Sequence, residues 1–214
     1  MPLRIVTWNV NGLRAISSKF GGVRRVLEAL ERCDVVCLQE TKLTRSELDH
    51  DLAVVPDWES YFAFSRSRSG YSGVATFCRR GATVPSAAAG GFAGWQDCDD
   101  LDDLLPGELD ALDSEGRCVM TDHGQFVLLN IYAPAITSTE NMEQRMEFKV
   151  QWYEALHQRA ASLVQHGRNV VIVGDFNVSL HPEDTVHRSF LMHLFLQLTY
   201  CYLCCMLCTV SATV

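Results

Sequence analysis

Short apolar runs separated by turn residues recur along the first 80 residues of the chain. The run 3–8 (LRIVTW) predicts a buried strand that ends in an Asn-Gly turn, and the run 34–39 (DVVCLQ) predicts a second strand. Apolar residues at helical spacing over 23–30 predict a helix between them. The runs 58–64 and 73–78 flank a basic, glycine-containing segment and predict a β-hairpin. The pattern therefore indicates a β-helix-β unit followed by a hairpin.

The second half of the chain predicts further strands. The runs 117–121 and 126–132 predict a pair of strands, and the run 169–173 (NVVIV) predicts another buried strand. Residues 86–111 follow neither a helical nor a strand period, and we expect a long surface insertion there. Hairpins mixed with β-helix-β units indicate an α/β fold with mixed sheets.

A long helix is predicted over residues 140–166, where apolar side chains recur at helical spacing before Gly167 supplies a C-cap signal. The face expected to be buried carries Met146, Val150, Tyr153, Leu156, Ala160, Leu163 and Val164. The chain shows no internal repeat.

Composition is that of a folded globular protein. The chain has 214 residues, of which 48% are hydrophobic and 21% charged, and this excludes a disordered, collagen-like or disulfide-stapled chain. The formal net charge is −8, but nine acidic residues and no Lys or Arg lie within 97–115. The other 17 acidic residues are balanced by 18 Lys and Arg, so the rest of the surface could carry a positive groove.

The nine cysteines fall into two groups. Five are scattered, and those inside apolar runs are expected to pack as reduced, small hydrophobic residues. The other four crowd into 201–208 (CYLCCMLC) without the His partners of a typical zinc site. No secretory signal is visible at the N-terminus, and we expect a reducing intracellular compartment.

Polar side chains stand at the ends of four predicted strands. These are Asn9, Glu40, Tyr132, and the pair Asp175 and Asn177. Each one alone has an ordinary explanation as a turn, a helix start or a half-buried aromatic residue. Together, their oxygen and amide groups suit Mg²⁺, which prefers one or two carboxylates plus substrate phosphate.

Asp175 and Asn177 are separated by one residue, so in an extended segment their side chains lie on the same side. A carboxylate beside a carboxamide suits phosphodiester hydrolysis. Asp175 would take a proton from water, and Asn177 would donate a hydrogen bond to the charge that develops on the phosphate oxygens.

Six motifs in order carry a family resemblance. They are TWNVNGLR (7–14), LQETK (38–42), SGYSGVATF (69–77), DSEGR (113–117), NIYAP (130–134) and VGDFN (173–177). In this order they resemble the motifs of the exonuclease III family of apurinic/apyrimidinic (AP) endonucleases. SRSRSGYSGVATFCRR and ALDSEGR resemble its AP endonuclease 2 branch most. The resemblance extends over about residues 3–182.

The resemblance implies a four-layer α/β fold, a two-sheet sandwich of the deoxyribonuclease I or endonuclease/exonuclease/phosphatase type. It implies Mg²⁺-dependent cleavage of DNA on the 5′ side of an abasic site, with Mn²⁺ as a substitute metal, together with 3′-5′ exonuclease and 3′-phosphodiesterase activity in base-excision repair. The partners it implies are DNA with abasic sites or blocked 3′ ends. The location it implies is the nucleus, with the mitochondrion as a second one.

The resemblance also assigns roles to the polar residues at the strand ends. Asn9, Glu40, Asp175 and Asn177 match metal-site residues, and Tyr132 matches a residue that contacts the scissile phosphate. The catalytic set is then Tyr132, Asp175 as the acid/base residue, and Asn177, which stabilises the transition state.

Four further positions match residues that face DNA in relatives. They are Arg14, Lys42, Tyr71 and Arg117, for each of which surface charge or simple packing remains an alternative explanation. The acidic segment 97–115 is expected to face away from DNA or to bind a basic protein partner.

The resemblance ends after Pro182, whereas the family continues with strands that carry aspartates and a final Asp-His dyad. We expect residues 1–184 to form an endonuclease/exonuclease/phosphatase domain with an incomplete C-terminal part, and 185–214 to be an apolar, Cys-rich tail outside the family. Asp122 and His123 lie between two predicted strands, so we interpret them as a turn and not as the dyad.

The tail contains 21 residues without a formal charge, 190–210. Three interpretations stay open: a membrane anchor, a metal or cofactor segment, and an alternative or spurious translation. Three functions also stay open: an AP endonuclease, an inactive fragment that binds DNA or a partner, and a Mg²⁺ phosphodiesterase acting on a non-DNA substrate such as an inositol phosphate. The basic hairpin tip at 66–68 favours DNA.

Overall fold

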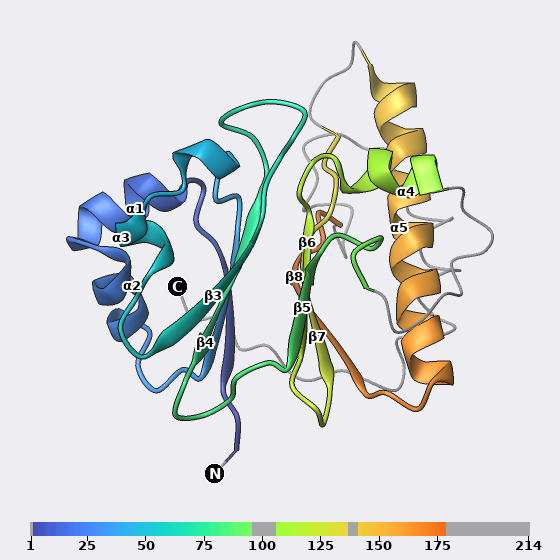
Figure 1. Cartoon of the computed structure of the whole chain (residues 1–214). Coiled ribbons are helices and arrows are strands. Elements are labelled where there is room, and N and C mark those ends of the chain that lie inside the picture. The colour runs from blue at the N-terminus through green and yellow to red at the C-terminus, as the bar shows by residue number, and fades with distance from the viewer. Residues whose placement is uncertain (1, 96–105, 137–140, 179–214) are drawn as a thin grey trace. The chain divides into compact units, whose positions relative to one another are not determined.

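The computed structural model describes residues 2–95, 106–136 and 141–178. These residues form two four-stranded sheets that face each other, with helices on the outer side of each sheet (Figure 1). The predicted α/β sandwich is confirmed, and the boundary predicted at residue 184 lies outside the described residues.

Sheet A is built from the N-terminal half of the chain. Its strands, in spatial order, are β1 (Ile5–Asn9), β2 (Val35–Gln39), β4 (Val74–Arg79) and β3 (Trp58–Ala63). The helices on its outer side are α1 (Leu13–Phe20), α2 (Val23–Ala29), the 3₁₀ turn η1 (Arg45–Glu47) and α3 (His50–Ala53). β1 and β2 are parallel and β3 pairs with β4 as an antiparallel hairpin, so the predicted β-helix-β unit and hairpin are both confirmed.

Sheet B follows in the second half. Its strands, in spatial order, are β5 (Ala87–Gly90), β6 (Cys118–Asp122), β7 (Val127–Tyr132) and β8 (Val170–Asp175). The helix α5 (Met142–Gln165) carries the chain from β7 to the parallel strand β8, and α4 (Pro106–Asp113) lies beside it (Figure 1). The pair β6–β7 and the strand β8 agree with the apolar runs of the sequence.

The prediction of a surface insertion over 86–111 is wrong for the part that the structure describes. Phe92, Trp95 and Leu109 are buried in the core beneath sheet B. The Asp113 carboxylate accepts hydrogen bonds from the backbone N–H groups of Phe92 and Ala93, at 2.8 and 2.9 Å. The segment is held by a few separate buried side chains and by the Asp113 carboxylate. Its sequence therefore shows no regular hydrophobic period.

The buried face of α5 also differs from the prediction. Its buried residues are Lys149, Trp152, Ala155, Leu156, Arg159, Ser162 and Leu163, whereas Val164 is exposed. Arg159 donates a hydrogen bond to the carbonyl of Phe92 at 2.7 Å. An apolar pattern cannot reveal this face, because its long polar side chains are buried with partners from distant segments.

An apolar cluster lies between the sheets. Val35, Cys37, Cys78, Leu128 and Val173 pack there. The thiols of the described cysteines, Cys33, Cys37, Cys78 and Cys118, are free and buried, including those inside apolar runs, for which packed thiols were predicted. No helix in the described part of the chain is both long and apolar enough to span a bilayer, and the segment 190–210 lies outside that part.

Candidate active site

The two sheets bring the predicted polar residues together. Asn9 ends β1 in sheet A, and Asp175 ends β8 in sheet B. The Asn9 Nδ2 group donates one hydrogen bond to Glu40 Oε1 at 2.8 Å and another to Asp175 Oδ2 at 2.9 Å. Tyr132 lies beside Asp175 in the β7–β8 register. One carboxamide therefore joins a carboxylate of each sheet.

Glu40 is held as a carboxylate. Burial acts to raise the pKa of Glu40, but hydrogen bonds from Asn9, Lys42 and Tyr132 outweigh it, and the pKa lies below its ordinary value. The Lys42 Nζ atom lies 3.2 Å from Glu40 Oε2. The carboxylate is therefore charged at neutral pH and available to a cation.

Tyr132 is held in its neutral form. Burial, followed by the charge of Glu40 and the hydrogen bond to it, raises the pKa of Tyr132 to about 12. The hydroxyl donates to Glu40 and keeps its proton across the physiological range. Tyr132 can therefore act as a hydrogen-bond donor at this end of the sandwich.

Asp175 and Asn177 lie close together, although not in the extended conformation that we predicted. The backbone N–H of Asn177 donates to Asp175 Oδ1 at 2.9 Å, and Asn177 has a φ of 50°. The Asn177 Nδ2 group donates to the carbonyl of Ala133 at 2.7 Å. A tight turn closed by the Asp175 carboxylate replaces the extended segment.

Two residues that the sequence analysis missed hold this turn from α5. Lys149 Nζ donates to the carbonyl of Asn177 at 2.7 Å, and the Tyr153 hydroxyl donates to the carbonyl of Phe176. Burial, followed by the charge of Arg117, lowers the pKa of Lys149, while Asp175 opposes this shift. The sequence carries no signal for these contacts, because both acceptors are backbone carbonyls of a distant segment.

Backbone strain concentrates in the loops around the cluster. Among the described non-glycine residues with positive φ are Asn11, Glu40, Lys42, Ser72 and Asn177. Hydrogen bonds tie these loops together: Gly12 N donates to Glu40 O at 2.7 Å, and Lys42 N donates to Ser72 O at 2.8 Å. Strained residues are often found at functional sites, and here they mark the same end of the sandwich.

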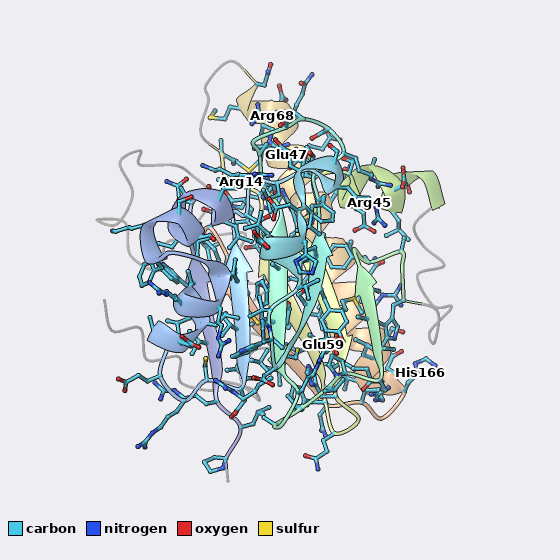
Figure 2. All side chains as sticks on the ribbon, turned by 60° about the vertical axis from the view of Figure 1, so that its left-hand side comes forward. Arg14, Arg45, Glu47, Glu59, Arg68 and His166 are labelled. Atoms are coloured by element: carbon cyan, nitrogen blue, oxygen red, sulfur yellow. The ribbon has the colours of Figure 1, made fainter. Side chains whose placement is uncertain are left out.

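Basic and aromatic residues surround this end. Figure 2 shows Arg14, Arg45 and Arg68 there, with Glu47 among them. The Arg14 side chain is exposed and lies 3.6 Å from the carboxylate of Asp49. The Arg68 guanidinium stacks on the predicted DNA-facing residue Tyr71, 3.7 Å from the ring centroid.

Arg117 departs from its predicted role at the DNA surface, because its side chain is only 2% exposed. Its Nε donates to Glu115 at 2.6 Å, and one terminal nitrogen donates to the carbonyls of Tyr132 at 2.9 Å and Ala133 at 3.2 Å. The other terminal nitrogen donates to the Tyr71 hydroxyl at 2.8 Å. The guanidinium is thus satisfied inside the protein and supports the strand end that carries Tyr132.

The described part of the acidic segment has internal partners. Glu115 pairs with Arg117 and with Arg145, the latter at 2.8 Å. Asp110 pairs with Arg66 of the hairpin tip at 2.8 Å. Residues 97–105 of this segment lie outside the described residues.

Asp122 and His123 form the predicted turn. His123 N donates to Phe126 O at 2.9 Å, and Gly124 N donates to Asp122 Oδ1 at 2.7 Å. The His123 ring contacts Thr83 and Thr121. Asp122 and His123 are therefore bonded to neighbouring residues, at the opposite end of β7 from Tyr132.

The donor set fits a hard divalent cation. Glu40 and Asp175 place two carboxylates around one amide, and Mg²⁺ prefers one or two carboxylates together with substrate oxygens. Asn9 directs its nitrogen at both carboxylates, while its oxygen accepts the N–H of Asn11 at 3.1 Å. Glu40 and Asp175 are thus better placed than Asn9 as direct ligands. Among the described residues, no group of three or more His, Cys, Asp or Glu side chains could hold a metal ion.

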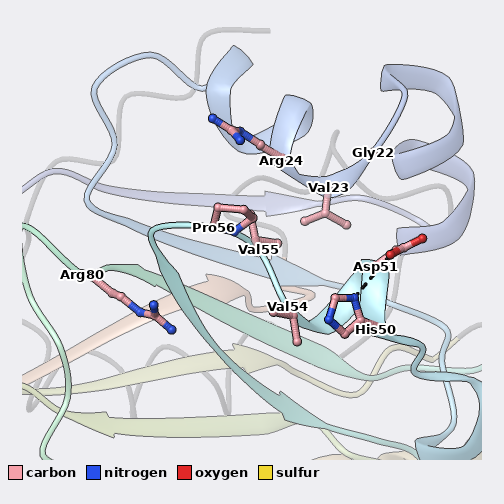
Figure 3. A pocket seen from close by; sticks show the side chains of 9 residues that line it. All are labelled: Gly22, Val23, Arg24, His50, Asp51, Val54, Val55, Pro56 and Arg80. Carbon is pink, nitrogen blue, oxygen red and sulfur yellow. Dashed lines mark hydrogen bonds and ion pairs between the residues drawn. The ribbon is translucent and has the colours of Figure 1, made fainter.

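An open groove of about 330 Å³ is separate from this cluster (Figure 3). It lies between α2, α3 and the segment 54–56, and its rim includes Arg24 and Arg80. Arg24 pairs with Glu28 and Arg80 with Glu59, each at 2.8 Å. The charged side chains that line the groove are paired with each other or with neighbouring residues, and none of them belongs to the predicted site.

Comparisons with known proteins identify the family of this chain. The profile of the endonuclease/exonuclease/phosphatase family matches residues 6–195. The DNA-(apurinic or apyrimidinic site) endonuclease 2 of Bos taurus is 41% identical over 211 residues, covering 85% of this chain and 40% of that protein. An exodeoxyribonuclease of Bacillus subtilis is 29% identical, covering 85% of this chain and 60% of that protein.

A solved structure shares the fold. The catalytic domain of Xenopus laevis APE2 superposes with a TM-score of 0.72 at 39% identity, covering 83% of this chain and 59% of that domain. The chain spans about two fifths of the length of the AP endonuclease 2 proteins that it matches. The resemblance predicted from the six motifs is confirmed. The chain belongs to the endonuclease/exonuclease/phosphatase family.

Proposed function

We propose that this chain is a Mg²⁺-dependent DNA phosphodiesterase of the AP endonuclease 2 type, which cleaves at abasic sites and trims blocked 3′ ends in base-excision repair. The names of its relatives support the substrate class. The observation that carries the proposal is the Asn9 carboxamide, which bonds Glu40 of one sheet and Asp175 of the other at 2.8 and 2.9 Å.

Glu40 and Asp175 would hold the metal ion. When bound, Mg²⁺, or Mn²⁺ in its place, would neutralise charge on the scissile phosphate. Asn9 keeps the two carboxylates in place through its Nδ2 group. Asp175 is anchored on both oxygens by neutral N–H donors, so it stays oriented while it accepts a proton from the attacking water.

The remaining groups act on the phosphate. Tyr132 keeps its hydroxyl proton and can redirect it from Glu40 to a phosphate oxygen. Asn177 uses one Nδ2 hydrogen for the Ala133 carbonyl and retains the second for the charge that develops in the transition state. Fixed donors of this kind stabilise a transition state because they need little reorganisation.

Arg14, Lys42 and Tyr71 would contact the DNA backbone around this cluster, with Arg68 stacked on Tyr71. Phosphate contacts by basic side chains give sequence-independent binding, which suits an enzyme that recognises damage in any sequence.

We propose a nuclear location from the eukaryotic relatives, with the mitochondrion as a second location, and a basic protein partner for the segment 97–115. We also propose that residues 185–214 form a region separate from the domain 1–184.

The test is a nicking assay with a duplex that carries one abasic analogue, in Mg²⁺ and in EDTA. We expect a Mg²⁺-dependent cut on the 5′ side of the analogue and slower cutting of undamaged duplex. Binding without cutting in either buffer would contradict the proposal and select a DNA-binding fragment. Hydrolysis of an inositol phosphate in the absence of DNA cleavage would select the non-DNA phosphodiesterase.

A further inference from the structure

Two polar residues inside the family motifs have no part in the chemistry described above. Gln39 is the last residue of β2, and Asn130 lies in the middle of β7. Both are almost completely buried, with exposed fractions of 1% for Gln39 and 0% for Asn130. Buried polar groups of this kind are costly unless they are bonded, so their presence needs a physical reason.

Asn130 uses both ends of its carboxamide to reach sheet A. Its Oδ1 accepts a hydrogen bond from Gln39 Nε2 at 2.7 Å. Its Nδ2 donates to the carbonyl of Ala75 at 2.9 Å and to Thr76 Oγ1 at 3.2 Å. Gln39 Nε2 also donates to Thr7 Oγ1 at 3.0 Å. One residue of sheet B is therefore bonded to β2 and β4 of sheet A, and through Gln39 it is linked to β1.

This hydrogen-bonded link lies next to the proposed active site along the chain. Gln39 immediately precedes Glu40. Asn130 and Tyr132 are two residues apart on β7, so their side chains project from the same face. In the β7–β8 register, Tyr132 is paired with Asp175. The position of sheet B relative to sheet A therefore sets the distance between Glu40 and Asp175.

The apolar contacts of this interior do not specify that position. Val35, Leu128 and Val173 contribute apolar burial, which is non-directional. Hydrogen bonds are directional, and sliding one sheet by one residue, about 3.3 Å, would break the whole Gln39–Asn130 link. We propose that Gln39 and Asn130 are positioning residues that fix the two sheets in the register in which Glu40 and Asp175 share one metal site.

This inference rests on the proposed function for the identity of the metal site, and Mn²⁺ alone is the probe. Titration by water-proton relaxation should show binding to the wild-type protein that is lost in Glu40→Gln. Asn130→Leu and Gln39→Met should each weaken Mn²⁺ binding by about tenfold, the size of effect typical of residues behind a metal ligand. The matched control is Leu128→Val, which perturbs the same face of β7 without removing a hydrogen bond.

Thermal unfolding of each variant separates positioning from stability. The positioning role stands if Leu128→Val lowers the unfolding midpoint as much as Asn130→Leu does but, unlike Asn130→Leu, binds Mn²⁺ within about twofold of wild type. If Asn130→Leu and Gln39→Met bind Mn²⁺ like wild type, the inference is overturned and the proposed function survives. Absence of Mn²⁺ binding by the wild-type protein would instead overturn the proposed metal site.

A metal-free measurement tests the inference independently of that site. The Asn9 Nδ2 hydrogens bridge the two sheets, so their exchange with solvent, followed by NMR, reports the register directly. We expect faster exchange in Asn130→Leu and wild-type exchange in Leu128→Val. Equal exchange rates in the two variants would contradict the positioning role.

Discussion

The buried Glu115 cluster offers a sharp test of the electrostatics of this fold. Glu115 has a side chain only 11% exposed and lies 2.6 Å from Arg117 and 2.8 Å from Arg145. The substitution Glu115→Gln removes the negative charge and leaves the buried Arg117 guanidinium without a counter-ion. Breaking one partner of a buried pair costs about 3–5 kcal/mol, and we expect about 3 kcal/mol because the glutamine oxygen can keep one hydrogen bond.

The assay is equilibrium unfolding in urea, followed by tryptophan fluorescence. With a slope of about 2 kcal/mol per molar urea for a domain of this size, the midpoint should fall by about 1.5 M. The matched control is Glu59→Gln, whose carboxylate also lies 2.8 Å from a guanidinium, that of Arg80, but at an exposed site. Exposed pairs contribute at most about 1 kcal/mol, so this variant should shift the midpoint by less than about 0.5 M. Equal shifts in the two variants would refute the reasoning.

The pH dependence carries a definite sign. Burial acts to raise the pKa of Glu115, but hydrogen bonds and charges of Arg145 and Arg117 outweigh it, so the folded pKa lies below the ordinary value of 4.5. The stabilisation is therefore fully present above pH 4.5 and is lost as the pH falls through the lowered folded pKa. In Glu115→Gln, this part of the acid-induced loss of folding stability should be absent. An unchanged pH profile between wild type and variant would contradict the assignment.

Two further predictions concern the turn that carries Asp175. Lys149→Met removes the hydrogen bond to the Asn177 carbonyl. The nicking rate at saturating DNA should fall about tenfold, with little change in DNA affinity. An unchanged rate in single-turnover nicking would contradict a role of Lys149 in holding the turn. Gly174 has a φ of 136°, and a Cβ at this position would overlap the carbonyl oxygen of Ile131. Gly174→Ala should therefore lower the free energy of unfolding, measured in urea, by about 3 kcal/mol or more. Gly81→Ala, at a site with open space, should cost less than about 1 kcal/mol; similar losses in both alanine variants would contradict the steric argument.

Much of the fold could be predicted because most strands coincide with continuous apolar runs. The runs at 34–39 and 169–173 coincide with β2 and β8 within two residues. The catalytic cluster could be anticipated for a related reason. The carboxyl ends of parallel strands meet at one edge of a sheet, so Asn9 and Glu40 are brought together in sheet A, and Tyr132 and Asp175 in sheet B.

What the sequence could not supply were long-range partners of polar side chains. Arg117 is indistinguishable from a surface arginine until Arg145, 28 residues away, joins it around Glu115. Lys149 is equally hidden, because its acceptor is a backbone carbonyl in another element. Hydrophobic periodicity counts apolar residues and therefore fails where a buried face includes satisfied charges.

The central claim is that Asp175, joined to Glu40 through Asn9, belongs to a phosphodiesterase centre. The most direct test compares single-turnover nicking of abasic duplex by wild type, Asp175→Ala and the exposed control Asp57→Ala in Mg²⁺. Asp175→Ala should lose at least about 10³-fold in rate with DNA binding retained, whereas Asp57→Ala should match wild type. Nicking by Asp175→Ala at the wild-type rate would contradict the claim.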